Sequence, residues 1–180
     1  MARALRPNIA GGIYHVTARG VRRQPIFEDE REYERFRELL RSIVEELRWV
    51  CHAYCQMPNH YHLVIETPQP NLSVGMQRLN SRYAAWFNWR RGHVGHVFES
   101  RFYSGPVESN AHLLEVARYV VLNPVRARLC PHPGAWTYSS YRARGTARLL
   151  GQFGDDPTQA RRRYEEFVAA EIAVPSGRVL

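Results

Sequence analysis

The stretch of residues 49–67, WVCHAYCQMPNHYHLVIET, carries the clearest indication of the fold. Both of its halves are rich in β-forming residues, and Pro58-Asn59 between them is typical of a turn. Proline cannot donate a hydrogen bond within a central ladder, so the chain is expected to reverse there. The stretch therefore predicts a hairpin of two strands, at residues 49–57 and 61–67.

The sequence on either side of this hairpin shows helical and strand periodicities. Alternating apolar residues predict a strand at 11–18, and apolar residues three and four apart predict an amphipathic helix from Asp29 to Leu47. Asn71 is a plausible N-cap for a second helix that runs to Phe87. The remaining predicted elements are a strand at 96–104, a third helix from Ser109 whose end Pro124 disturbs, and a helix at 157–172.

The order strand, helix, strand, strand, helix, strand, helix predicts the fold class. It is α+β: a ferredoxin-like βαββαβ unit with a four-stranded antiparallel sheet, helices on one face, and an additional C-terminal helix. We expect residues 1–145 to form this domain. Residues 146–180 show weak periodicity and are predicted to be a peripheral tail, and the segment from 131 onward is available to cover a sheet edge.

Composition and charge limit the function classes. No stretch approaches the ~18 consecutive apolar residues of a membrane helix, and the first residues do not form a secretory signal. Three cysteines fit a reducing cytoplasm better than a disulfide framework. The net charge is +8, and every cationic residue is arginine. Positive charge gathers at residues 1–27 and 67–150 around an acidic segment at 28–46, which favours a nucleic-acid partner.

His60 and His62 are the first candidates for chemistry. Side chains two apart on a strand share a face, so both imidazoles can hold one divalent metal while Tyr61 points the other way. A hydrogen-bonded pair of structural histidines would give the same pattern. A zinc site that adds Cys51 and Cys55 is a poor fit, because these thiols would lie about 13 Å apart along one face of the strand. Both cysteines are better interpreted as buried apolar residues.

Tyr119 and Asn123 are the second pair of candidates. They lie four residues apart on the third predicted helix and so share a face. Arg118 and Arg126 flank them, which suggests a surface that handles phosphate. If this helix packs near the hairpin, two imidazoles, an amide oxygen and a phenol surround one metal. Simple packing of Tyr119 is the alternative interpretation.

Four ordered motifs resemble those of the REP-associated tyrosine transposases, domesticated relatives of the insertion-sequence-200-like transposases. The motifs are Gly12–Gly20, Met57–His62, Phe98–Phe102 and Tyr119–Ala127. The resemblance covers roughly residues 8–145. Tyr61 departs from the pattern, because an aliphatic residue usually stands there between the two histidines of the HUH motif. The tail matches nothing in the family pattern.

The resemblance implies an enzyme that cuts and rejoins single-stranded DNA at hairpin-associated sites. Tyr119 would be the nucleophile, forming a 5′-phosphotyrosine, and His60, His62 and Asn123 would hold Mg²⁺ or Mn²⁺. Tyr138 and Tyr141 are the rival nucleophiles. The alternative function is a non-catalytic nucleic-acid-binding module of the same fold.

Arginine side chains are expected to bind the DNA. The short connection before the third helix predicts the oligomeric state. The predicted DNA-binding residues are Arg19, Arg22, Arg23, Arg78, Arg82, Arg90, Arg91, Arg101, Arg118 and Arg126. Only seventeen steps separate Phe102 from Tyr119, and most are helical, so the helix is expected to return over its own sheet. We therefore predict a monomer, with a homodimer that shares its active sites as the alternative.

Overall fold

The computed structural model describes residues 9–142 and 147–172. Its elements, in chain order, are the strand β1 (Gly12–Arg19), the 3₁₀ turn η1 (Val21–Arg23), the helix α1 (Glu30–Glu46), the hairpin β2 (Val50–Met57) and β3 (His60–Thr67), α2 (Leu72–Arg91), β4 (Tyr103–Pro106), α3 (Asn110–Arg126), the 3₁₀ turn η2 (Pro133–Ala135), α4 (Ala147–Gly151) and α5 (Pro157–Ile172). None of the described helices is long and apolar enough to cross a membrane.

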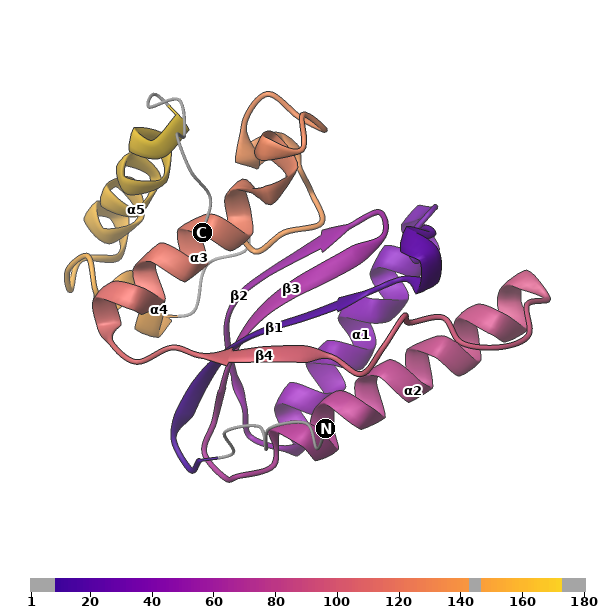
Figure 1. Cartoon of the computed structure of the whole chain (residues 1–180). Helices are drawn as coiled ribbons and strands as arrows, with labels where there is room; N and C mark the ends of the chain where they lie inside the picture. Colours follow the sequence, from indigo (N-terminus) through magenta and orange to yellow (C-terminus); the bar gives the residue numbers. More distant parts are fainter. Residues whose placement is uncertain (1–8, 143–146, 173–180) are drawn as a thin grey trace, which may run out of the picture.

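The four strands form one antiparallel sheet in the order β2-β3-β1-β4. This order and the element sequence confirm the predicted ferredoxin-like α+β fold. Helices α1 and α2 cover one face of the sheet, and α3 lies across the other, with α5 on its outer side (Figure 1). The helix that carries Tyr119 is thus separated from the other two by the whole thickness of the sheet.

Each face of the sheet has its own apolar core. Tyr14, Phe36, Tyr61 and Leu63 are buried between the sheet and α1/α2. Val64, Val120 and Val121 belong to the core under α3. The alternation of β1 and β3 therefore determines which side chains face α3, and these include His15, His60 and His62.

The fourth strand is shorter and later than its predicted range of 96–104. It spans only Tyr103–Pro106 and pairs with β1. The residues before it form an irregular segment that meets the end of β1 through a bridge between Phe98 and Gly20 and a hydrogen bond from the Glu99 amide to the Arg19 carbonyl. Val97 and Phe102 nevertheless fill the first core, so the apolar spacing reflects packing of a loop and not a strand.

A β-bulge at His52 changes the faces of β2. Cys51 pairs with Ile65 and the next registered pair is Ala53 with Val64, so one residue is inserted between them. As a result Cys51 packs at the edge of the first core, whereas Cys55 is buried in the second. The expectation that the two thiols share a face is wrong, and the reason is the inserted residue. Their apolar environment agrees with the interpretation of both cysteines as packing residues.

The predicted N-cap of α2 has a different role in the structure. Asn71 makes no capping hydrogen bond with its side chain. Its Oδ1 instead accepts a hydrogen bond of 2.6 Å from the indole Nε1 of Trp49. The start of α1 agrees with the sequence-based prediction, because Asp29 precedes the helix and forms a full capping box with Glu32.

The C-terminal third of the chain is an integral part of the fold. Tyr164 and Val168 of α5 and Leu149 of α4 are buried in the second core. Residues 138–140 lie along the outer edge of β2, where the Gln56 amide donates to the Tyr138 carbonyl at 2.9 Å. The expected covering of a sheet edge is present, and α4 and α5 contribute side chains to the second core.

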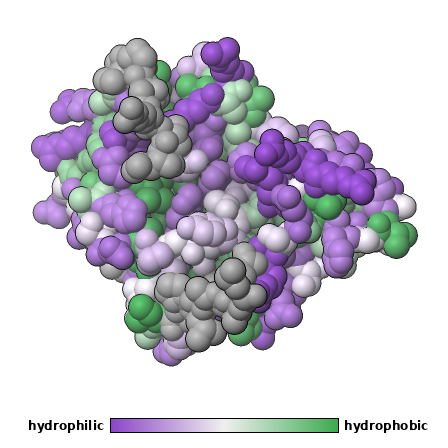
Figure 2. Space-filling model, viewed as in Figure 1, coloured by the Kyte–Doolittle hydropathy of each residue, from purple (hydrophilic) through white to green (hydrophobic). Residues whose placement is uncertain are grey.

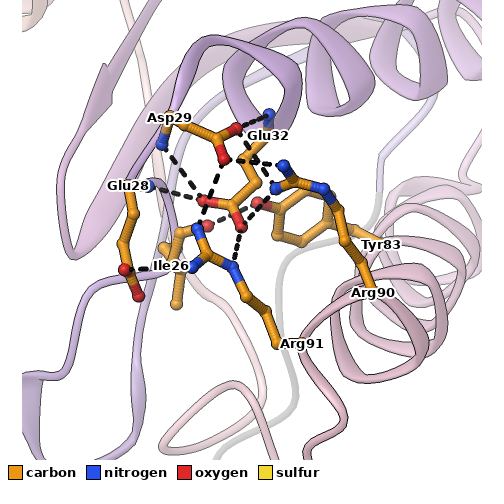
Figure 3. Close-up of polar contacts among 7 residues, drawn as sticks. All are labelled: Ile26, Glu28, Asp29, Glu32, Tyr83, Arg90 and Arg91. Atoms are coloured by element: carbon orange, nitrogen blue, oxygen red, sulfur yellow. Dashed lines mark hydrogen bonds and ion pairs between the residues drawn. The ribbon is translucent and has the colours of Figure 1, made fainter.

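Two arginines at the end of α2 join it to the start of α1. The buried carboxylate of Glu32 accepts hydrogen bonds from Arg90 at 2.9 Å and from Arg91 at 2.6 Å (Figure 3). Arg90 also pairs with Asp29 at 2.7 Å. A buried carboxylate needs this pairing, because an unpaired charge in the interior is strongly destabilising. The structure thus gives Arg90 and Arg91 a structural role, and their binding of DNA stays a prediction.

The acidic segment is consequently not a separate negative face. Besides the pairs at Glu32, Arg78 of α2 is ion-paired with Glu46 at the other end of α1. Arginines of α2 therefore neutralise acids at both ends of α1. On the face seen in Figure 2, hydrophilic residues predominate and hydrophobic ones are scattered.

Candidate active site

The two histidines of the hairpin lie on the face of β3 that α3 covers. The ring centres of His60 and His62 are 5.0 Å apart. Tyr61 points to the opposite face, where its hydroxyl donates to Asn80 of α2 at 2.6 Å. A buried tyrosine in place of an aliphatic residue is accommodated in this way, because its hydroxyl has a partner.

Helix α3 brings Tyr119 to these histidines. Its ring meets that of His62 edge to face, with 5.6 Å between the ring centres. Asn123 lies one turn further on, where its Nδ2 donates to the carbonyl of Tyr119 at 2.9 Å. Ser109 accepts a hydrogen bond from the His112 amide and so caps the helix. Pro124 lies within α3, which continues to Arg126.

His15 of β1 belongs to the same cluster and was not among the predicted site residues. Its Nε2 lies 3.0 Å from the Nδ1 of His62, and the two rings are stacked. Its ring also meets that of Tyr119, with 5.9 Å between their centres. The alternation in β1 places His15 on the same sheet face as His62. That alternation, combined with the antiparallel pairing of β1 and β3, is the signal that could have found it.

Burial keeps the three imidazoles neutral. It lowers the pKa of His15 to about 4, with His112 as a second cause. Burial and the neighbouring Arg19 lower the pKa of His60 to about 4. The pKa of His62 is lowered well below its ordinary value, first by burial and then by the neighbouring His15, His60 and Arg19. Neutral imidazole is the form that binds metal ions.

The arginines after β1 lie beside the hairpin. Arg19 pairs in register with His60 across the sheet. Arg22 and Arg23, in η1, both have a left-handed backbone, with φ values of 52° and 60°. The Arg23 carbonyl accepts a hydrogen bond of 3.1 Å from the side chain of Asn59 in the hairpin turn. All three arginine side chains are exposed.

The other predicted arginines fall into two groups. Arg118 and Arg126 flank Tyr119 and are both ion-paired with Glu171 of α5. Arg82 of α2 and Arg101 in the segment before β4 are exposed.

The rival tyrosines lie in other surroundings. The ring of Tyr138 stacks on that of Tyr33, with 3.6 Å between their centres, and Tyr141 packs against Tyr164. Among the described residues, Tyr119 is the tyrosine whose ring contacts those of His15 and His62. No set of three or more histidine, cysteine or acidic side chains in the described part of the chain is arranged to hold a metal ion.

Comparison with protein families identifies the chain. The family model described as "Transposase IS200 like" matches residues 8–123, which include β1, the histidine hairpin and Tyr119. The chain belongs to the IS200-like transposase family. It is accordingly an enzyme of the HUH type, which nicks and rejoins DNA. Comparison with curated proteins gives no match.

Of two similar solved structures, the first supports the fold. The structure of a REP-associated tyrosine transposase bound to a REP hairpin matches with a TM-score of 0.66 and 18% sequence identity, over 78% of this chain and 82% of that chain. A putative transposase from Deinococcus radiodurans matches with a TM-score of 0.47 and 17% identity, over 66% of this chain and 95% of that chain.

Proposed function

We propose that this transposase cuts and rejoins single-stranded DNA by a metal-dependent mechanism in which Tyr119 is the nucleophile. The observation that carries the proposal is the edge-to-face contact of Tyr119 with His62, since these residues come from α3 and β3 and meet on one face of the sheet. A non-catalytic DNA-binding module would not require this juxtaposition.

The residues present fit a divalent cation. His60 and His62 offer neutral imidazoles on one face, as their lowered pKa values require. The Nδ2 of Asn123 is bound to backbone carbonyls of α3, which leaves its amide oxygen as the atom that can act as a ligand. A mixed set of nitrogen and oxygen ligands suits Mn²⁺ or Mg²⁺ when DNA phosphate or water completes the coordination.

The proposed reaction needs no nucleotide cofactor, because one phosphoester bond is exchanged for another. The Tyr119 oxygen attacks the scissile phosphorus as its phenol loses a proton, and the 3′ oxygen leaves and gains one. The products are a 5′-phosphotyrosine and a free 3′-hydroxyl. Attack by another 3′-hydroxyl reverses the step and joins the strands. The bound cation would polarise the phosphate and offset the charge that develops on it.

The DNA is proposed to reach the site over the exposed arginines beside the hairpin. Arg19, Arg22 and Arg23 surround the hairpin end that carries His60. A related fold has been solved with a REP hairpin, which supports a hairpin with an adjoining single strand as the substrate. The exposed Arg82 and Arg101 extend the candidate DNA surface. We expect this reaction to take place in the cytoplasm, in keeping with the absence of disulfides among the three cysteines.

The deciding experiment looks for a covalent protein–DNA adduct. Purified protein is incubated with hairpin-bearing single-stranded DNA and Mn²⁺, and products are resolved under denaturing conditions. We expect an adduct with the wild type and with Tyr138→Phe, and none with Tyr119→Phe, which keeps the ring but lacks the hydroxyl. An unchanged amount of adduct in Tyr119→Phe would contradict the assignment of Tyr119 as the nucleophile. DNA binding without any adduct in the wild type would favour the non-catalytic module.

We further propose that a single chain completes its own site. Tyr119 lies against His62 of the same chain, and α5 packs on α3 to hold it there. A mixture of the His60→Ala, His62→Ala double variant with Tyr119→Phe should therefore stay inactive. Restored cleavage in the mixture would demonstrate a homodimer with shared sites.

A further inference from the structure

Two side chains next to the metal-binding histidines, Asn59 and His15, each hold one of them through its Nδ1 atom. We propose that Asn59 and His15 are positioning residues that keep the proton of His60 and of His62 on Nδ1, so that both histidines present Nε2 to the metal. The inference rests on the proposed function for the identity of the metal ligands.

The His60 half of the arrangement follows from the turn between β2 and β3. The Nδ2 of Asn59 donates to the carbonyl of Arg23 at 3.1 Å, which fixes the orientation of its amide. The Oδ1 of Asn59 then faces the Nδ1 of His60 at 2.7 Å. An amide oxygen can only accept, so His60 must donate from Nδ1. Its Nε2 is therefore the atom with a free lone pair.

The His62 half uses β1 as its support. The Nε2 of His15 lies 3.0 Å from the Nδ1 of His62. Between two neutral imidazoles one nitrogen must donate and the other accept. If His15 donated, Nδ1 of His62 would be the acceptor and the His62 proton would lie on Nε2. The Nε2 atom of His62 would then have no lone pair to offer to a metal held by Nε2 of His60. Donation from His62 Nδ1 gives both histidines the same tautomer, and His15 then carries its own proton on Nδ1.

This arrangement also couples the metal ligands to the other parts of the site. His15 meets the ring of Tyr119, so the residue that orients a ligand also contacts the nucleophile. Asn59 joins His60 to the backbone of Arg23 in the arginine-bearing η1 turn. Fixing the tautomer of a ligand through its second nitrogen generally alters metal affinity by about 10- to 100-fold.

The first test measures the tautomers directly. Long-range ¹H–¹⁵N correlation spectra of the metal-free wild-type protein distinguish Nδ1–H from Nε2–H imidazoles. We expect Nδ1–H for His15, His60 and His62. A proton on Nε2 of either His60 or His62 would overturn the proposal. This measurement needs no variant, no metal and no DNA.

The second test measures Mn²⁺ affinity by titration calorimetry. We expect about 10- to 100-fold weaker binding in Asn59→Leu and His15→Phe, which remove the acceptor. Asn59→Asp and His15→Gln retain an oxygen acceptor and should recover most of the affinity. His93→Phe, in the exposed loop after α2, is the matched control and should bind as the wild type does. DNA affinity in EDTA should stay within about twofold for the His15 and His93 variants.

The outcomes separate this inference from the proposed function. Wild-type Mn²⁺ affinity in both Asn59→Leu and His15→Phe would overturn the positioning roles, even if adduct formation needs Tyr119 as proposed. Wild-type Mn²⁺ affinity in the His60→Ala, His62→Ala double variant would instead remove the metal site from the proposed function. In that case the tautomers of His60 and His62, measured by NMR without metal, still test the inference.

Discussion

The guanidinium carbon of Arg126 lies 4.9 Å from the centre of the Tyr119 ring. The same guanidinium is ion-paired with Glu171 of α5, and Glu171 also pairs with Arg118 at 2.6 Å. A cation over an aromatic ring is attracted by the ring's electrons and restrains its orientation. The position of Tyr119 is thus connected to α5 through Arg126.

We predict that Arg126→Gln slows adduct formation at Tyr119 by about tenfold, the effect of losing ~1.4 kcal/mol of interaction at the nucleophile. The ring loses both its stacked cation and the connection to Glu171. Single-turnover assays with labelled hairpin DNA measure the rate. Arg162→Gln, on an exposed part of α5, is the control and should keep the wild-type rate. Equal rates in the two variants would show that Arg126 does not act on the nucleophile.

We predict that Tyr164→Ala lowers the free energy of unfolding by about 3 kcal/mol, because it leaves a cavity in the second core. Tyr164 of α5 is 3% exposed. Urea unfolding followed by circular dichroism gives the value. Tyr103→Ala serves as the control, since that side chain is 63% exposed and should change stability by less than about 0.5 kcal/mol. An equally small change in the free energy of unfolding for both variants would show that α5 contributes little to the stability of the fold.

We predict that replacing Arg19, Arg22 and Arg23 by glutamine weakens binding of hairpin DNA and reduces its salt dependence. Each lost phosphate contact lowers the slope of log K against log salt by about 0.7 on a single strand. Fluorescence anisotropy across a salt series measures both quantities. Arg37→Gln with Arg41→Gln, on α1, is the comparison and should change neither. An equal loss in both sets would mean that η1 is not part of the DNA surface.

Stability at acidic pH should depend on Asp29. A hydrogen bond from Arg90 is the largest cause that lowers the pKa of Asp29 below its ordinary 3.8. Since the folded pKa is depressed, this contribution is fully present above pH 3.8 and is lost as the pH falls through the folded value. Asn is as good an N-cap as Asp, so Asp29→Asn removes mainly the charge.

The variant should therefore be less stable than the wild type in urea at pH 7. The difference should be smaller at about pH 2 than at pH 7, because Asp29 becomes protonated as the pH falls through its folded pKa. A difference that is the same at both pH values would show that the ion pair with Arg90 contributes nothing to stability.

The elements with a local signature were predictable from the sequence. The apolar stripe from Tyr33 to Val44 and the capping residue Asp29 define α1 within a residue of its observed ends. The hairpin and α5 have comparable local signals, a Pro-Asn turn and a helical period. The pairing of His60 with His62 also follows locally, because side chains two apart on a strand share a face.

What the sequence could not predict depends on contacts between distant segments. The irregular segment before β4 resembles a strand because Val97 and Phe102 must reach the first core. The bulge at His52 is visible only in the register of β2 against β3. The ion pairs of Arg90 and Arg91 with the buried Glu32 join residues about sixty positions apart and have no local signal. The place of His15 in the site was not predictable for the same reason, because its partner His62 is forty-seven residues away.

The strip at residues 138–140 that covers β2 has a consequence for synthesis of the protein on the ribosome. The sheet is complete once β4 has been made, yet the outer edge of β2 acquires its cover only when a segment more than thirty residues later has left the exit tunnel. During that interval an emerging chain exposes unpaired backbone groups of a strand, which is the state in which two nascent chains on neighbouring ribosomes can pair. Residues 138–140 thus protect the outer edge of β2 against aggregation of newly synthesised chains.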